Sequence, residues 1–383
     1  MLQLLEKREL FEKLLEKANK TSFEYNKIPV SGYELVLEIK EKKSGLHGII
    51  AIHNTTLGFA LGGTRIQDYH SFEKALEDVL RLSKGMTYKS AIAQTGLGGG
   101  KSVILLDPNA PNKKEVLSAF GVAVDHLEGL YVCAEDMGCS TEDVAAIAEK
   151  TPYVTGLIHD KSSGNPSPFT AWGTFKGIQA CLFHKFRSSS LEGKKIAIQG
   201  LGSVGKVLCE YLFWHGAELI VSDINQDSID EMVKKYGATA VDANDIYQVK
   251  CDVFCPCAMG GILNEMTIPS LRCSIVAGAA NNQLYCNSNA DQLMKKGILY
   301  APDFVINAGG LYNVAEEISE EGYLPKIARN KTDSIYNTLL DIFEIAETNH
   351  QSTHQASMEL AEYRIKYGIG LREKAACFHH KIK

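Results

Sequence analysis

The chain has 383 residues, 45% of them hydrophobic and 22% charged, with a formal net charge of −6. These proportions are typical of a globular protein, and a chain of this length predicts two domains of roughly 150 residues each. The negative charge and the lack of a long basic run argue against a nucleic-acid or membrane-surface partner. Residues 1–20 mix charges with leucines at helical spacing, which predicts an amphipathic helix rather than a signal peptide or a membrane span.

The next segments predict the start of an α/β domain. Residues 33–40 alternate apolar and polar side chains as a strand with one wet face does, and residues 47–54 form a more apolar strand. Gly62 and Gly63 follow, and they indicate either a tight turn or a place where the backbone itself holds a ligand. A helix is expected over residues 72–86.

A glycine-rich segment at residues 96–101 separates two lysines, Lys89 and Lys101. Three consecutive glycines before Lys101 leave room for backbone or ligand to approach closely. A lysine buried near a second cation can lose its proton near neutral pH and then serve as a base. The ending GGGKS resembles a P-loop, but Thr95 stands where that motif has its first glycine, so a nucleoside-triphosphate site is disfavoured.

A second candidate for chemistry follows further along the chain. Residues 102–107 predict a buried strand, and a helix is expected to begin near Lys113. The short apolar strand after it ends in two carboxylates, the second of them Asp136. The carboxyl ends of strands are where α/β proteins place their chemistry, so Asp136 is a candidate catalytic residue. Alternatively, Asp136 caps the helix predicted over residues 141–150, for which Thr141 is another candidate cap.

Composition marks a boundary in the middle of the chain. Residues 162–173 are rich in Ser, Gly, Asn and Pro and predict a linker, with a helix from about Phe169 to Phe183. We therefore expect the first domain to end near residue 155.

The second domain begins with the pattern of a dinucleotide-binding unit. A short apolar strand at 194–200 leads into GLGSVG at 200–205, a helix follows directly, and the next strand ends in Asp223. Placed between strand and helix, with an acid about twenty residues on, G-x-G-x-x-G is a strong signal. The glycines let a pyrophosphate reach the free N–H groups of the helix N-terminus. Asp223 would accept hydrogen bonds from the adenosine ribose and repel a 2′-phosphate, so NAD is favoured over NADP.

Three later segments, 251–261, 273–284 and 299–310, each read as a strand that ends in small residues. Such ends line the crevice above a parallel sheet, so asparagines there face a cofactor or substrate, or else satisfy turn backbone. Helices are expected after Asp333, and residues 378–383 are predicted to be a solvated tail. The residues expected to contact the cofactor are Gly200, Leu201, Gly202, Ser203, Val204, Gly205, Lys206, Asp223, Thr170, Ala258, Asn281 and Asn282, and Asn307 is a further candidate for this crevice.

The ten cysteines are scattered through apolar stretches, and the chain shows no secretory signal. We therefore expect reduced, buried thiols and a cytoplasmic protein. Cys255 and Cys257 lack the C-x-x-C spacing, and no His or Cys cluster completes a zinc site, so no metal is expected.

Nine motifs, in order, span roughly residues 60 to 320. They are LGGTR (61–65), GMTYK (85–89), GLGGGK (96–101), AEDMG (134–138), PYVTG (152–156), GNPSPFTAWG (164–173), QGLGSVG (199–205), GAANNQL (278–284) and INAGGLYNVAEE (306–317). Together they resemble the amino-acid dehydrogenases of the glutamate/leucine/phenylalanine/valine superfamily, and most closely the short leucine dehydrogenase branch.

The resemblance implies reversible, NAD-dependent oxidative deamination of an L-amino acid to a 2-oxo acid and ammonia. By resemblance, Lys89 binds the substrate carboxylate with help from Gly62 and Gly63. Lys101 is the general base that activates water against the imine, and Asp136 shuttles protons to and from the amino group. A second cation nearby lowers the pKa of a lysine, as a base that works near neutral pH requires, and a carboxylate beside the two lysines can take the ammonium proton.

The positions that the family uses for its side-chain pocket resemble Leu61, Ala134, Leu311 and Val314, all of them apolar. A glutamate γ-carboxylate would lie there without a cation, at a desolvation cost of several kcal/mol or more. An aliphatic, branched side chain therefore suits the pocket best. Leucine, valine and phenylalanine differ mainly in volume, and pockets separate such substrates by only ~1–3 kcal/mol.

The fold expected from this resemblance is α/β with two domains and an interdomain cleft. A substrate-binding and catalytic domain would cover residues 1–155, completed by C-terminal helices at about 335–383, and a Rossmann-type, doubly wound NAD-binding domain would cover 156–334. The resemblance also implies a homo-oligomer. The alternatives are a phenylalanine or valine dehydrogenase, a dehydrogenase-like condensing enzyme, or a non-catalytic NAD-binding sensor, against which the presence of Lys89, Lys101 and Asp136 argues.

Overall fold

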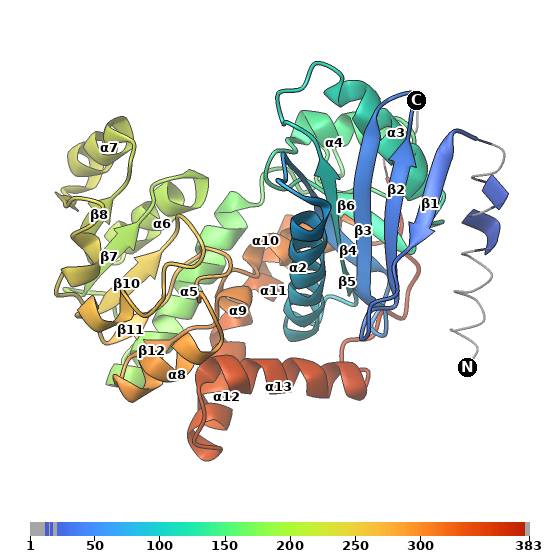
Figure 1. Ribbon diagram of the computed structural model, residues 1–383. Helices are drawn as coiled ribbons and strands as arrows, with labels where there is room; N and C mark the ends of the chain where they lie inside the picture. The colour runs from blue at the N-terminus through green and yellow to red at the C-terminus, as the bar shows by residue number, and fades with distance from the viewer. Residues whose placement is uncertain (1–11, 15, 18–20, 380–383) are drawn as a thin grey trace. The chain divides into compact units, whose positions relative to one another are not determined.

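The computed structural model describes residues 12–14, 16–17 and 21–379 (Figure 1). Most of the helix expected over residues 1–20, including Phe11, Leu15 and Ala18, lies outside the described residues, and the described parts at 12–14 and 16–17 are helical.

The chain forms two compact units that each draw on several segments. Unit 1 comprises residues 1–164, 314–324 and 364–383, and unit 2 comprises residues 165–313 and 325–363. The division therefore falls at Gly164, later than the expected position near residue 155. The expected C-terminal completion of the first domain also differs, because most of the helical segment after residue 335 belongs to unit 2.

Unit 1 contains a six-stranded mixed sheet in the order β1-β2-β3-β5-β4-β6. The first three strands and β5 pair antiparallel, whereas β4 pairs parallel with both β5 and β6. The strands are β1 (Phe23–Lys27), β2 (Leu35–Glu41), β3 (Leu46–Asn54), β4 (Ala60–Gln67), β5 (Gly98–Leu105) and β6 (Tyr131–Ala134). Parallel pairing puts the carboxyl ends of β4, β5 and β6 at one edge of the sheet.

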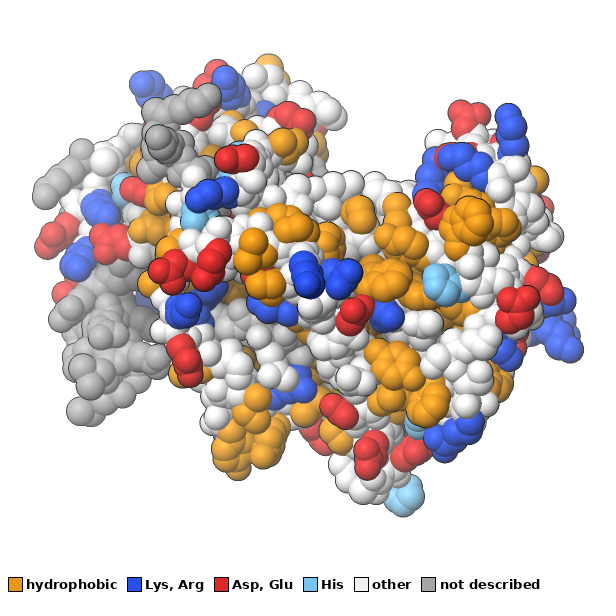
Figure 2. Space-filling model, turned by 180° about the vertical axis from the view of Figure 1, so that it is seen from behind, with side chains coloured by type: hydrophobic (Ala, Val, Ile, Leu, Met, Phe, Trp, Pro, Cys, Tyr) orange, Lys and Arg blue, Asp and Glu red, His pale blue; other side chains and the backbone are white. Residues whose placement is uncertain are grey.

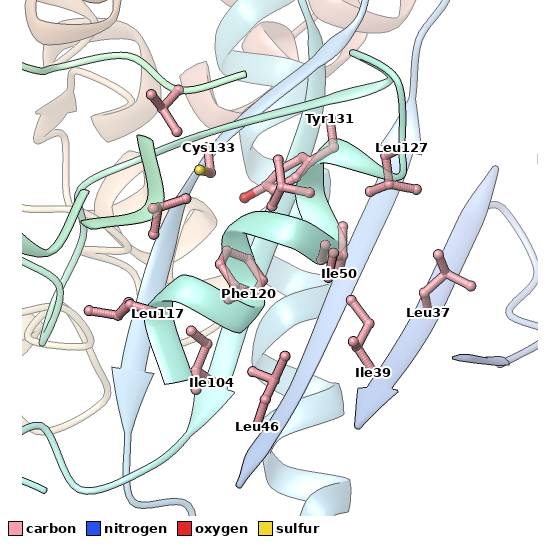
Figure 3. Packing of buried hydrophobic residues seen from close by; sticks show 14 of the residues in the cluster. Leu37, Ile39, Leu46, Ile50, Ile104, Leu117, Phe120, Leu127, Tyr131 and Cys133 are labelled. Carbon is pink, nitrogen blue, oxygen red and sulfur yellow. The ribbon is translucent and has the colours of Figure 1, made fainter. Parts of the chain in front are cut away.

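Helices cover both faces of this sheet. Helix α2 (Phe72–Ile92) packs on β3 and β5, and α3 (Lys113–Asp125) packs with α4 (Thr141–Ala148) on the opposite face. Residues of β3 alternate between the two layers. Ile50 belongs to the core with α3 (Figure 3), and Ile49 belongs to the core with α2. The strand expected at residues 33–40 is β2. The expectation that one of its faces is solvated is wrong, because Val36 is buried under α2.

Gly62 and Gly63 lie inside β4, so the first of the two alternatives for them, a tight turn, is wrong. The helix that follows is longer than expected and runs through residues 85–89 to Ile92. Its N-terminus is capped by Ser71, whose hydroxyl accepts the amide N–H of Lys74.

Unit 2 contains a six-stranded, fully parallel sheet in the order β12-β11-β10-β7-β8-β9, as a dinucleotide-binding fold requires. The strands are β7 (Lys195–Gln199), β8 (Glu218–Ser222), β9 (Thr239–Ala240), β10 (Val253–Pro256), β11 (Ile275–Val276) and β12 (Leu299–Tyr300). The α-helices after α4 are α5 (Ser167–Phe186), α6 (Ser203–Trp214), α7 (Gln226–Tyr236), α8 (Ser288–Lys295), α9 (Asp303–Ile306), α10 (Gly309–Glu317), α11 (Pro325–Asp333), α12 (Ile335–Thr348) and α13 (Thr353–Lys366). Unit 2 ends at Asn313 within α10 and resumes at Pro325, and it ends again within α13.

Of the solvated tail expected over residues 378–383, residues 380–383 lie outside the described part of the chain, and Phe378 and His379 are packed rather than solvated. The ring of Phe378 contacts the rings of Phe59 and Tyr153, with centroid distances of 6.4 and 5.5 Å. His379 Nε2 lies 2.8 Å from the carbonyl oxygen of Ser319. The part of this tail that the structure describes is therefore packed against unit 1.

On the face shown in Figure 2, acidic and basic side chains are interspersed rather than separated by sign. Among the described residues, none of the helices is long and apolar enough to cross a membrane. All ten cysteines are free thiols, and five of them are buried.

Candidate active site

A buried ion pair joins Lys101 of β5 to Asp136, which follows β6 by two residues. Lys101 Nζ lies 2.6 Å from Asp136 Oδ2, and the lysine side chain is 8% exposed. Strand β4 runs between β5 and β6, so the pair reaches across the backbone of Gly63. A Cβ at Gly63 would lie 2.8 Å from the Cβ of Asp136 and 3.0 Å from Lys101 Nζ. Glycine is therefore required at this position for the ion pair to form.

Asp136 has a second cation that sequence reasoning missed. The Nε of Arg65, on β4, lies 3.2 Å from Asp136 Oδ2, and its Nη1 lies 2.8 Å from Oδ2 of Asp78 on α2. Asp78 also accepts hydrogen bonds from the hydroxyl of Tyr69 and from Arg81. The available signal was an arginine within a strand of small and apolar residues, because a charge in such a strand needs partners.

The charges around Asp136 determine its protonation state. Burial alone would raise the pKa of the Asp136 carboxyl, but Lys101 and Arg65 lower it below its ordinary value. Burial likewise opposes the charge on Arg65, yet Asp136 and Asp78 raise the pKa of its guanidinium. Asp136 is therefore an anion held between two cations.

The structure shows what the glycines before Lys101 make room for. A Cβ at Gly99 would lie 2.5 Å from the Cα of Thr87 on α2, and a Cβ at Gly100 would lie 2.8 Å from the ring of Tyr131. These glycines thus let a helix and an aromatic ring pack against β5. The hydroxyl of Tyr131 donates a hydrogen bond to the carbonyl oxygen of Gly62, 2.8 Å away.

The two alternative caps for α4 are both excluded. The N-cap is Ser140, and its hydroxyl and the side chain of Asp143 form a capping box. Thr141 instead donates to Glu135 Oε2 at 2.9 Å. Asp136 is therefore available for the charge network described above.

Lys89 lies in the last turn of α2 and is half-buried. The same helix supplies Thr87, which packs against Gly99 of β5, two residues before Lys101. Among the apolar pocket positions, Leu61 and Ala134 are buried and lie in the paired strands β4 and β6. Leu311 is buried and Val314 is half-buried, and both lie in α10.

The turn between β7 and α6 has the geometry of a dinucleotide-binding site. Gly200 has φ of 100°, and a Cβ there would lie 2.7 Å from the amide nitrogen of Ala258. A Cβ at Gly205 would collide with the carbonyl oxygen of Gly200, whereas Gly202 faces open space. Helix α6 has no side-chain cap, so its first N–H groups are available to an anion. These residues fit the pyrophosphate of a nicotinamide dinucleotide.

Asp223 follows β8, and its two carboxylate oxygens accept hydrogen bonds from the backbone N–H groups of Leu201 and Asn225. Asp223 therefore stabilises the glycine turn through its hydrogen bond from Leu201. Lys206 forms an ion pair with Glu231, with 2.6 Å between Nζ and Oε2.

The other predicted cofactor contacts lie around this turn and at the ends of neighbouring elements. Ser203 and Val204 begin α6, and Ala258 follows β10. Thr170 lies in the first turn of α5, and its hydroxyl donates to the carbonyl oxygen of Pro166 at 3.1 Å. Asn281 and Asn282 are exposed after β11, and Asn282 has φ of 51°.

Asn307 satisfies backbone in this region, which is the second of the two uses expected for these asparagines. Its side-chain amide donates to the carbonyl oxygen of Ala279 at 3.1 Å and to Asn281 Oδ1 at 2.8 Å. Asn307 is buried and joins the loop after β11 to the end of α9.

Among the described residues, no group of three or more His, Cys, Asp or Glu side chains could hold a metal ion. The sulfur atoms of Cys255 and Cys257 lie 3.7 Å apart.

Comparison with known proteins identifies the family. Residues 33–153 match the model for the dimerisation domain of Glu/Leu/Phe/Val dehydrogenases, and residues 218–367 match the model for glutamate/leucine/phenylalanine/valine dehydrogenase. A leucine dehydrogenase from Geobacillus stearothermophilus is 49% identical over 87% of this chain and 91% of its own. A phenylalanine dehydrogenase from Lysinibacillus sphaericus is 43% identical over 90% of this chain and 92% of its own.

Solved structures agree with this match. The crystal structure of L-tryptophan dehydrogenase from Nostoc punctiforme superimposes with a TM-score of 0.78 and 45% identity, covering 88% of this chain and 97% of that one. A hetero-hexameric glutamate dehydrogenase from Thermus thermophilus has a TM-score of 0.69 at 19% identity, covers 96% of this chain and 97% of that one, and shares the fold.

Proposed function

Because the chain belongs to the Glu/Leu/Phe/Val dehydrogenase family and is an amino-acid dehydrogenase, we propose that it carries out reversible, NAD-dependent oxidative deamination of a branched aliphatic L-amino acid. The products are the 2-oxo acid and ammonia. The observation that carries this proposal is the buried pair of Lys101 and Asp136, held beside Gly63 in a chain that also has a dinucleotide-binding turn.

The proposed roles of the side chains follow from their chemistry. Lys89 binds the substrate carboxylate as an ammonium ion. Lys101, when neutral, takes a proton from water as the water oxygen adds to the substrate imine carbon. Asp136, a carboxylate in the resting protein, takes a proton from the substrate ammonium group before hydride transfer and returns it to the departing nitrogen after water has added. Ammonia then leaves, the Asp136 carboxylate takes the hydroxyl proton, and the carbonyl of the 2-oxo acid forms. The chemistry that NAD supplies when bound is acceptance of hydride from the substrate Cα, which creates that imine.

The cofactor choice rests on Asp223 at the end of β8. Its carboxylate stands where the family of Rossmann folds places the ribose-binding acid, and its negative charge opposes a 2′-phosphate. Gly200, Gly202 and Gly205 would hold the pyrophosphate against the N-terminus of α6.

The aliphatic preference rests on four apolar pocket positions, Leu61, Ala134, Leu311 and Val314. A charged substrate side chain would have no counterion from these positions, which disfavours glutamate. Aromatic substrates are the second candidate, because relatives 43–46% identical are a phenylalanine and a tryptophan dehydrogenase. The dehydrogenase-like condensing enzyme and the NAD-binding sensor are the remaining alternatives.

We further propose that the chain works as a cytoplasmic homo-oligomer. The support is that residues 33–153 match the dimerisation domain of the family. Light scattering after size-exclusion chromatography tests the oligomer, and a monomer at micromolar concentration would contradict it.

One experiment tests the function. The protein is mixed with NAD or NADP and each of leucine, valine, isoleucine, phenylalanine, tryptophan and glutamate, and the absorbance of the reduced cofactor is followed. We expect turnover with NAD and highest kcat/KM for a branched aliphatic substrate. A preference for phenylalanine or tryptophan would replace the aliphatic assignment, and the absence of turnover with every substrate would favour the sensor or the condensing enzyme.

A further inference from the structure

The charged side chains around the Lys101–Asp136 pair alternate in sign from the centre of the sheet to the surface of α2. Lys101, Asp136, Arg65, Asp78 and Arg81 are joined in that order by contacts of 2.6, 3.2, 2.8 and 2.9 Å. The side chains of the first four are 8, 24, 16 and 14% exposed in that order, whereas that of Arg81 is 58% exposed. Arg65 is the only member that contacts both aspartates among the described residues.

Arg65 is suited to a role that a lysine could not fill. Its Nε and Nη1 contact two different carboxylates, those of Asp136, two residues after β6, and of Asp78 on α2, and its side chain is 16% exposed. The guanidinium is planar and carries donors in fixed directions, so it fixes both partners at once. It also stays protonated under all conditions in which proteins fold.

The proposed reaction requires a positive charge beside Asp136 that stays in place throughout the cycle. Lys101 must be neutral when it takes a proton from water, and at that moment its charge no longer balances Asp136. A carboxylate buried without a counterion would take up a proton and lose its function as a proton acceptor. Arg65 contacts the same Oδ2 atom as Lys101, so it supplies a countercharge that does not change during the cycle.

We propose that Arg65 is a positioning residue that keeps the Asp136 carboxylate ionised and fixed in place while Lys101 gains and loses its proton. Asp78, on α2, accepts a hydrogen bond from Arg65 and holds it in place. The hydroxyl of Tyr69 donates to the same Asp78 oxygen, Oδ2, which is 2.8 Å away. This inference rests on the proposed catalytic roles of Lys101 and Asp136.

The other titratable groups near Asp136 do not compete for this role. Tyr69, Tyr131 and Cys139 each feel its charge, but burial raises the pKa of all three, so they are neutral at working pH. Within the described part of the chain, the charged groups that act on Asp136 are therefore Lys101 from β5 and Arg65 from β4.

Two variants and one control test the proposal. Arg65→Gln removes the cation, and the double variant Arg65→Gln/Asp78→Asn removes it together with its anchor, which preserves the balance of buried charge. Arg81→Gln is the matched control, because Arg81 also pairs with Asp78 but does not contact Asp136. We expect kcat/KM to fall on the order of 10- to 100-fold in both Arg65 variants, part of what acid–base catalysis contributes, and by less than about 2-fold in the control.

The pH profile distinguishes positioning from a merely structural role. The acidic limb of kcat/KM should move to higher pH in the Arg65 variants and stay in place in Arg81→Gln. Selective labelling of aspartate with ¹³C at Cγ measures the same change in the ligand-free protein, with Asp136→Asn used to assign the resonance. The Asp136 titration midpoint should rise in the double variant.

The NMR titration needs no turnover, so it separates this inference from the proposed function. If the wild-type protein oxidises no amino acid, the proposed function is wrong, and the midpoint still decides whether Arg65 keeps Asp136 ionised. An Asp136 midpoint and an acidic limb unchanged in the double variant would overturn the inference.

Discussion

Lys101 and Asp136 meet across Gly63, with 2.6 Å between Nζ and Oδ2, although β5, which carries Lys101, is not paired with β6, which Asp136 follows. Strand β4 separates β5 from β6, and only a residue without a side chain lets two side chains contact over it. The glycines of LGGTR are thus explained by the sheet itself.

Gly63→Ala should disrupt the ion pair. The new Cβ would lie 2.5 Å from the carbonyl oxygen of Glu135 and 2.8 Å from the Cβ of Asp136, so the end of β6 must shift. We expect a loss of about 1–3 kcal/mol in the free energy of unfolding and a large fall in kcat. Urea unfolding and steady-state kinetics measure both.

The matched control for this variant is Gly85→Ala. Gly85 lies inside α2 and a Cβ there would have no atom within 4 Å. Alanine should increase stability by roughly 0.5–1 kcal/mol and leave kcat unchanged. A Gly63→Ala protein as active and stable as the control would contradict the role assigned to Gly63.

Glu317→Gln should change how stability depends on pH. The buried Glu317 carboxylate accepts hydrogen bonds from the N–H groups of Gly156 and Ser163, but burial outweighs them and raises its pKa. Folding therefore takes up a proton, and stability falls as pH rises from the ordinary value of 4.5 through the raised folded value.

Glutamine has no such proton to lose. The stability of Glu317→Gln relative to wild type should therefore increase as pH rises above the ordinary glutamate value of 4.5, as urea midpoints at several pH values would show. Parallel pH dependence in the two proteins would mean that Glu317 does not titrate differently on folding.

Asp223→Asn should weaken the discrimination between the two nicotinamide cofactors. The amide oxygen can still accept the N–H of Leu201 in the glycine turn, whereas the N–H of Asn225 loses its acceptor and the charge that opposes a 2′-phosphate is lost. Like-charge contacts cost several kcal/mol, so the ratio of kcat/KM for NAD over NADP should fall on the order of 10- to 100-fold. An unchanged ratio would place the discrimination elsewhere.

Phe378→Ala tests whether the C-terminal segment stabilises unit 1. The ring contacts Phe59 and Tyr153 but is only half-buried, so the loss should be about 1–2 kcal/mol, below the ~3–5 kcal/mol typical of a fully buried phenylalanine. Leu371→Ala, at an exposed position in the same segment, should change stability by less than about 0.5 kcal/mol. Equal effects of the two variants would contradict this packing.

The elements that the sequence predicted well have strong local signals. The turn at Gly200 and the helix after it are correct because the motif, the strand before it and Asp223 all agree. Helix α3 begins at Lys113 as expected, because its apolar residues recur at helical spacing.

The errors come from contacts between residues distant in sequence. For Gly62 and Gly63 the turn was one of two alternatives because glycine often marks a turn, whereas here the neighbouring strand β5 and the end of β6 leave no space for side chains. The contribution of residues 325–363 to unit 2 has no local signature, since it depends on which partner each helix packs against.

Arg65 shows the same limit within the site. Its motif was recognised, but its role depends on two carboxylates that lie 13 and 71 residues away in the chain. Only the parallel pairing of β4 and β6 and the packing of the charged face of α2 bring them together.

The most direct test of the proposed chemistry is the turnover of Lys101→Ala with NAD and the best substrate of the panel. We predict that kcat falls by at least roughly 10²–10⁴-fold, the usual contribution of a general base, while the Kd for NAD measured by fluorescence stays within about 2-fold. A Lys101→Ala protein with near-normal kcat would show that Lys101 is not the base.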